Sequence, residues 1–127
     1  MNNSLLCIQQ KIDNLQYGLL RFQDSAGPTT LHVKASTNED ATFNCIIVED
    51  SFDKKLYNTS VNLIQKSYND YIYITGKVAA EARQGSKILA IRIIKACWFE
   101  RIYRGNTSWL REKCMFESSV PELEFAG

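Results

Sequence analysis

Residues 71–78 read Tyr-Ile-Tyr-Ile-Thr-Gly-Lys-Val, and this stretch decides the expected fold. It is rich in aromatic and β-branched residues that alternate in direction, which is typical of a β-strand with one buried face. Every second side chain from Ile72 onward would point into a core, and the tyrosines would point outward. Gly76 predicts a bend, because glycine inside a strand often marks a bulge. A polar loop at 80–86 is expected to lead into a second strand at 87–97.

Three more strands are expected before this stretch. The candidates are residues 16–22, 29–36 and 41–48, separated by clusters of turn residues. The second and third candidates alternate with period two across a four-residue polar turn, which predicts a β-hairpin. Residues 5–16 fit either a short helix or a leading strand, and the pattern does not choose between them.

A helix is expected between the third and fourth strands. Apolar side chains recur there at positions i, i+4, i+7 and i+11, namely Tyr57, Val61, Ile64 and Tyr68. Asp53 offers a capping side chain at the start of this segment. The expected fold is therefore mainly β, a five-stranded barrel with one helix between its third and fourth strands.

The C-terminal part of the chain predicts a hairpin and a tail. Residues 98–116 hold two aromatic and basic runs on either side of Arg104-Gly105-Asn106-Thr107, which reads as a hairpin turn. Residues 117–127 are acidic and are expected to be flexible. The expected organisation is a domain of residues 1–97, a hairpin extension of residues 98–116 and the acidic tail.

Length and composition indicate an ordinary globular chain. The 127 residues are 45% hydrophobic and 23% charged, enough for one domain with its own core. No apolar run approaches the roughly 20 residues of a membrane helix. The start of the chain lacks the features of a secretory signal, so a cytoplasmic location without membrane contact is expected. The cysteines at 7, 45, 97 and 114 have no metal-site or redox spacing and are expected to be free thiols.

No motif predicts catalysis. A Ser-His-Asp or Cys-His relay would have to use His32, the only histidine, which we expect on the surface of a strand. A zinc site is not indicated, and the glycine-rich phosphate loops are absent from the sequence. Glu49-Asp50 could bind a metal, but capping of the following helix is the favoured reading. We therefore expect a protein without enzymatic activity, metal or cofactor.

Charge and aromatic residues instead suggest a polyanion as ligand. Residues 71–115 carry nine basic and three acidic side chains, a net charge of +6, whereas residues 1–70 carry −2 and residues 116–127 carry −3. Single-stranded nucleic acid is bound by exposed rings that stack on bases and by cations that contact phosphates. The stacking candidates are Tyr71, Tyr73 and Trp98. The phosphate-binding candidates are Lys34, Lys77, Arg83, Lys87 and Arg92. For any single tyrosine, core packing is an equally good reading.

Residues 41–95 resemble the bacterial single-stranded-DNA-binding protein family and its relative, primosomal replication protein B. Ala41-Thr-Phe-Asn-Cys-Ile-Ile-Val48 is similar to the third strand of that family, residues 71–78 to its fourth strand and residues 87–95 to its closing strand. The resemblance implies an OB-fold barrel, often oligomeric, that binds single strands without sequence readout. The family's long glycine-rich linker is not visible here, and Pro121-Glu-Leu-Glu-Phe125 only echoes its proline-phenylalanine tip.

The expected function is non-catalytic binding of single-stranded nucleic acid, with DNA as the preferred ligand, in replication, recombination or repair. The resemblance implies a homo-oligomer, with replication or repair proteins as further partners. The alternative is an OB-fold adaptor that binds proteins within a larger assembly. The near-neutral total charge and the apolar outer side of the strand at 87–97 favour that alternative.

Overall fold

The structure is a computed structural model that describes residues 3–49 and 52–118. Within these residues the chain forms one helix and seven strands and is mainly β, as expected. The elements are α1 (Asn3–Leu15), β1 (Tyr17–Asp24), β2 (Gly27–Thr37), β3 (Thr42–Ile47), β4 (Ser60–Lys66), β5 (Asp70–Gln84), β6 (Ser86–Arg104) and β7 (Thr107–Glu117). The described helix is too short and too polar to cross a membrane.

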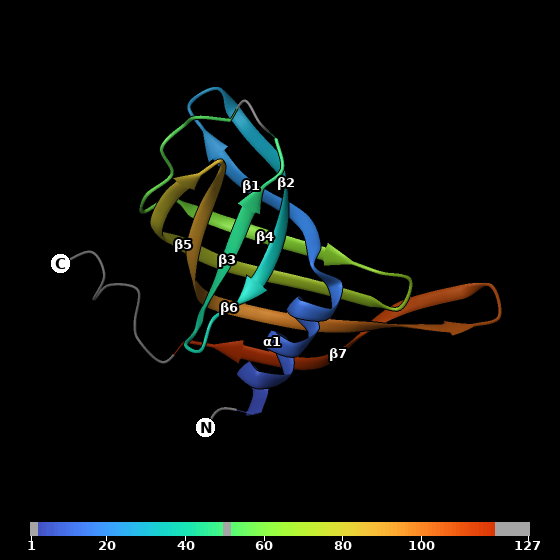
Figure 1. Cartoon of the computed structure of the whole chain (residues 1–127). Helices are drawn as coiled ribbons and strands as arrows, with labels where there is room; N and C mark the ends of the chain where they lie inside the picture. The colour runs from blue at the N-terminus through green and yellow to red at the C-terminus, as the bar shows by residue number, and fades with distance from the viewer. Residues whose placement is uncertain (1–2, 50–51, 119–127) are drawn as a thin grey trace.

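The strands form one antiparallel sheet that closes into a ring. Their order is β3-β2-β1-β4-β5-β6-β7, and β3 also pairs with β6. Six of the described strands therefore make the ring, and β7 continues the sheet outside β6 (Figure 1). The expected ring of five strands is wrong by one, because β4 lies between β1 and β5 and pairs with both.

The core lies inside the ring, where alternating side chains from the strands meet. Leu31, Val33 and Ala35 of β2 are buried while their neighbours are exposed, as their period-two pattern predicts. Ile72 and Ile74 of β5 are likewise fully buried. The expected hairpin of β2 and β3 is confirmed.

The ambiguous N-terminal segment is a helix. Ile8 and Ile12 lie one helical turn apart on α1, and both are fully buried in the core. The helix contacts β2, β4, β6 and β7. The apolar residues of this segment are therefore spaced as on one face of an amphipathic helix.

The expected helix between the third and fourth strands is wrong. Residues 60–66 form β4, whose Val61, Leu63 and Gln65 point into the core. Tyr57 and Tyr68, the ends of the supposed apolar stripe, are exposed. A short apolar run fits helix and strand alike, and here backbone pairing on both sides with β1 and β5 selects the strand.

Strands β5 and β6 are longer than expected. The loop expected at 80–86 is wrong, because pairing continues to Gln84 and Ser86 around a turn at Gly85. The bend expected at Gly76 is confirmed by a register shift between Thr75 and Gly76. A Cβ atom on Gly76 would lie 2.6 Å from the carbonyl oxygen of Arg92, so only glycine fits this close approach.

The expected C-terminal hairpin is confirmed. Arg104 pairs with Thr107 across a turn in which Gly105 has φ = 60°. The boundary that we expect at residues 97 and 98 falls within β6, so the hairpin continues a strand of the ring. Apart from Glu117 and Ser118, the acidic tail lies outside the described residues. All four cysteines are free thiols, as expected.

Candidate functional site

The outward side of β4, β5 and β6 forms one surface, which we name the outer face. Residues on it share a register across the three strands, while the residues between them point inward. The outer face consists of Ser60, Asn62, Ile64 and Lys66 on β4, Tyr71, Tyr73, Thr75 and Lys77 on β5, and Arg92, Lys95, Cys97 and Phe99 on β6.

Three aromatic rings gather on the outer face. Tyr71 and Phe99 are cross-strand partners whose ring centroids lie 6.2 Å apart at 60°. Tyr73 lies two residues further along β5 and is 38% exposed. Together with Thr75, Lys95 and Cys97, these rings line a groove of about 390 Å³. The groove therefore presents aromatic surface to solvent beside an ammonium group.

A second hollow extends this groove across the sheet. It has a volume of about 460 Å³ and shares Tyr73 and Thr75 with the first. From there it passes over Asn62 of β4 to Arg21 of β1. Thr75 Oγ1 donates a hydrogen bond to Asn62 Oδ1 at 3.1 Å, which joins the two strands at its floor. The two hollows share Tyr73 and Thr75, and we name them together the trough.

The outer face carries positive charge. The twelve outer-face residues include four cations and no carboxylate. Lys66 Nζ lies 5.8 Å from the ring centroid of Tyr71. Lys77 and Arg92 are direct cross-strand partners on β5 and β6.

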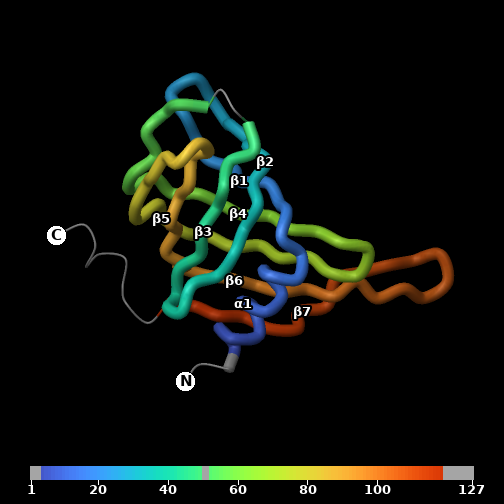
Figure 2. The backbone as a smooth tube through the Cα atoms, viewed as in Figure 1, coloured from blue at the N-terminus to red at the C-terminus, as the bar shows by residue number. Residues whose placement is uncertain are grey.

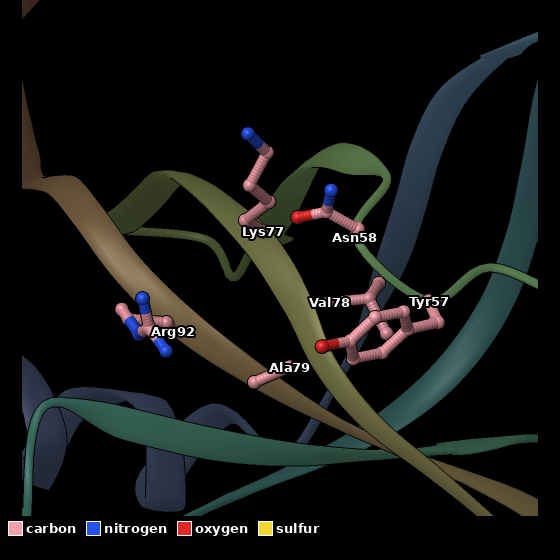
Figure 3. A pocket seen from close by; sticks show the side chains of 6 residues that line it. All are labelled: Tyr57, Asn58, Lys77, Val78, Ala79 and Arg92. Carbon is pink, nitrogen blue, oxygen red and sulfur yellow. The ribbon is translucent and has the colours of Figure 1, made fainter. Parts of the chain in front are cut away.

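Lys77 and Arg92 also border a smaller pocket of about 180 Å³. Figure 3 shows the two side chains on the neighbouring strands β5 and β6, with Tyr57 and Asn58 contributed by the segment before β4. Tyr57 is largely exposed. This pocket adds another ring beside the paired cations.

The thiol in the groove is a neutral group. Burial raises the pKa of Cys97, the nearby Glu112 and Glu117 raise it further, and Lys95 opposes them. Cys97 is therefore protonated at neutral pH and is a poor nucleophile. The two carboxylates that influence it come from β7, at the margin of the outer face.

Four of the eight predicted site residues lie together on the outer face. Tyr71, Tyr73, Lys77 and Arg92 are the members of this group. Lys34 is exposed elsewhere, on β2, with its Nζ 6.0 Å from the ring centroid of Tyr17.

Arg83 and Lys87 are engaged in holding the loop before β4. Arg83 Nη2 donates to the carbonyl oxygen of Phe52 at 2.8 Å and to Asp53 Oδ1 at 3.2 Å. Lys87 is only 8% exposed, donates to the carbonyl oxygen of Lys54 and pairs with Glu81 at 3.8 Å. The ammonium group of Lys87 is thus enclosed by these partners and lies away from the outer face.

Trp98 also lies away from the outer face. Its Nε1 donates to Asp70 Oδ1 at 2.8 Å, and Lys11 Nζ lies 4.6 Å from its ring centroid. The bulge opposite Gly76 leaves Ile94 without a partner on β5 and reverses the alternation of β6. Trp98 consequently packs against the core, and Phe99 takes the outward position.

Sequence reasoning missed several outer-face residues for two reasons: it did not foresee the bulge in β6, and it expected β4 to be helical. Phe99 and Lys95 point outward only because of the bulge. Lys66 and Asn62 belong to β4, which was expected to be helical. Reading residues 60–66 as a strand would have paired Lys66 with Tyr71.

His32 lies on the surface, as expected, and is paired with Glu49. Glu49 accepts hydrogen bonds from the backbone N–H of His32 at 2.9 Å and from its ring Nδ1 at 2.7 Å. Slight burial raises the pKa of Glu49, but these bonds outweigh it and hold the pKa below its usual value. The expected capping of a helix by Glu49 is wrong, because the next element is β4, and Asp50 of the same predicted pair lies outside the described residues. In the described ranges, no three His, Cys, Asp or Glu side chains come together as a metal site.

Comparison with known proteins adds no family to this geometry. Neither the protein-family models nor the curated protein sequences give a match to this chain.

Proposed function

We propose that the outer face binds single-stranded nucleic acid without catalysing a reaction. One observation carries this proposal: the outer face brings three aromatic rings and four cations together with no carboxylate among its twelve residues, and the three rings line an open groove with Lys95. Rings and cations on one surface serve the two parts of a nucleotide, the base and the phosphate.

The spacing of the rings suits an unpaired strand. Tyr71 and Tyr73 are two residues apart on β5 and therefore about 7 Å apart along the strand. Bases that are unstacked and extended can each meet one ring, at about 1–3 kcal/mol per base. Lys66, Lys77 and Lys95 are placed around the rings to contact the phosphates between them. Paired bases would not expose the faces that this arrangement needs.

The ring of strands supports an OB-like architecture as part of the proposal. In that reading β1, β2, β3, β5 and β6 take the places of the five OB strands, and β4 is inserted between β1 and β5. The resemblance of residues 41–95 to single-stranded-DNA-binding proteins favours DNA as the ligand. A cytoplasmic role in replication, recombination or repair, as a homo-oligomer with other replication or repair proteins, completes the proposal.

The proposal is tested by the affinity for a fluorescently labelled oligo-dT, measured by anisotropy over a range of salt concentrations. Changing Lys77→Glu together with Arg92→Glu should weaken binding at least tenfold and reduce its salt dependence by about two counterions. The matched control changes Lys55→Glu and Lys113→Glu, two exposed residues outside the trough, with the same total charge change. Equal affinities for the two double variants would contradict the proposed surface.

The adaptor function is the second candidate, and the C-terminal hairpin of residues 98–116, which we name the distal hairpin, favours it. Trp109, Leu110 and Met115 of β7 are exposed apolar side chains of the kind found at protein contacts. A titration of intrinsic fluorescence with oligo-dT at low salt separates the two functions. Nucleic-acid binding predicts quenching of the outer-face tyrosines, whereas an adaptor predicts no change.

A further inference from the structure

A stacked pair of tyrosines lies outside the trough. The rings of Tyr68, in the turn between β4 and β5, and Tyr103, near the end of β6, have centroids 5.4 Å apart and planes at 21°. Tyr103 Oη donates a hydrogen bond to the carbonyl oxygen of Tyr68 at 3.3 Å. Both rings are accessible, because Tyr68 is 77% exposed and Tyr103 is 48% exposed.

The pair joins two projecting parts of the molecule. Figures 1 and 2 show the β4–β5 turn and the β6–β7 hairpin extending from the same side of the ring. The backbone N–H of Arg101 donates to the carbonyl oxygen of Asn69 at 2.7 Å, so the two are also connected through their main chains. The rings are thus held by a backbone contact that does not depend on their stacking.

The pair continues the outer face along β6. Phe99, Arg101 and Tyr103 are alternate residues of one strand and therefore lie on the same side of it. Phe99 belongs to the groove, so the aromatic surface passes from the trough to the tyrosine pair. Arg101 lies between the two, with its Nη1 donating to Ser108 Oγ at 3.3 Å.

A purely structural role explains this arrangement poorly. A ring that stabilises a fold does so by removing apolar surface from water, and Tyr68 leaves most of its surface in water. The pKa of Tyr103 is raised, first by desolvation and then by Tyr68, so its hydroxyl is uncharged at neutral pH. An uncharged, accessible ring beside Arg101 is the same combination of aromatic ring and cation that the trough presents.

We infer that the Tyr68–Tyr103 pair is a second base-stacking subsite for single-stranded nucleic acid, reached by a strand that leaves the trough along β6. This inference rests on the proposed function and adds the path of the ligand. A base stacks on the accessible face of Tyr68, and the phosphates between the two subsites contact Arg101. Only a strand long enough to span both subsites uses the pair.

The test compares two lengths of labelled oligo-dT, about 6 and about 20 nucleotides, within the range of known site sizes. Changing Tyr68→Ala and Tyr103→Ala together should weaken binding of the long oligonucleotide about fivefold or more and leave the short one unchanged. The Tyr68→Phe and Tyr103→Phe double variant keeps both rings and should bind the long oligonucleotide like the parent.

Trp109→Ala is the matched control. Trp109 is 45% exposed on the same hairpin, but it pairs with Ile102 and so lies on the opposite side from Tyr103. Its removal should not change the affinity for either length. Thermal unfolding of each variant confirms that the ring of strands is intact.

Three results would overturn the inference: equal loss for both lengths, no loss for the long oligonucleotide, or an equal loss in Trp109→Ala. If the parent binds both lengths through Lys77 and Arg92 without any effect of the tyrosine pair, the proposed function stands and only the second subsite falls. If the parent binds neither length, both fall together.

Discussion

The closed ring and the distal hairpin are built from the same strand pairing but obey different constraints. In the ring, one side of each strand is sealed, and residues such as Phe43, Ile74 and Ile91 have no exposed surface. In the hairpin, every residue from Tyr103 to Lys113 is exposed. The ring must choose its inward side chains for packing, whereas the hairpin has no core to fill.

This difference separates stability from binding. A two-stranded ribbon is marginal alone, and this one is attached to the ring through β6 and the contact between Arg101 and Asn69. The exposed aromatic side chains of this ribbon contribute little to packing, so their presence needs another explanation. The aromatic residues on the outer face of the ring stand between these extremes, since they cover the sheet and also line a trough.

Truncating one aromatic residue in the ring of strands and one in the distal hairpin should give the largest difference in stability between the two regions. Phe43→Ala should lower the free energy of unfolding by about 3–5 kcal/mol, because it leaves a cavity in a sealed core. Trp109→Ala should change it by about 0.5 kcal/mol or less. Urea denaturation followed by circular dichroism measures both, and similar losses would refute the contrast.

Substituting the glycine at the bend of β5 should cost more stability than substituting the glycine in the turn after β6. Gly76→Ala forces a Cβ against the backbone of Arg92 and should cost about 1–3 kcal/mol. Gly105→Asn should cost less than about 1 kcal/mol, because no atom lies within 4 Å and asparagine tolerates a positive φ. Thermal denaturation of the two variants gives the comparison, and a larger effect at Gly105 would contradict it.

Cysteine labelling can sharpen the distinction between the outer face and the opposite side of the sheet. With only one accessible thiol retained in each variant, a saturating oligonucleotide should slow maleimide modification of Cys97 several-fold, because Cys97 lines the groove. Cys114 bonds the carbonyl oxygen of Ser4 on α1, so its rate should not change. Mass spectrometry over time measures both rates, and equal protection would argue against a ligand in the trough.

The acidic margin of β7 should produce the smallest effect. Glu117 lies opposite Lys95 in the register. Glu117→Gln should raise the affinity for oligo-dT roughly twofold at low salt, the scale of an exposed charge pair, and the gain should vanish at high salt. Anisotropy titrations at two salt concentrations test this, and a weaker affinity at low salt would contradict it.

The sequence by itself determined the features that depend on local periodicity. Alternation in residues 29–36 and 71–78 predicted which side chains enter the core, and turn residues predicted the two hairpins. Four of the candidate site residues, including Tyr73 and Lys77, lie on one surface for the same reason: side chains of a strand alternate.

Only the tertiary structure decided the rest, because it depends on which segments pair. Residues 60–66 became a strand through contacts with β1 and β5, which their own spacing does not specify. One bulged residue, Ile94, exchanged the directions of Trp98 and Phe99 and so replaced one predicted ring by another. Lys87 was enclosed by a loop distant in sequence. Pairing between remote segments sets register and burial, and neither is written in the order of residues along a single strand.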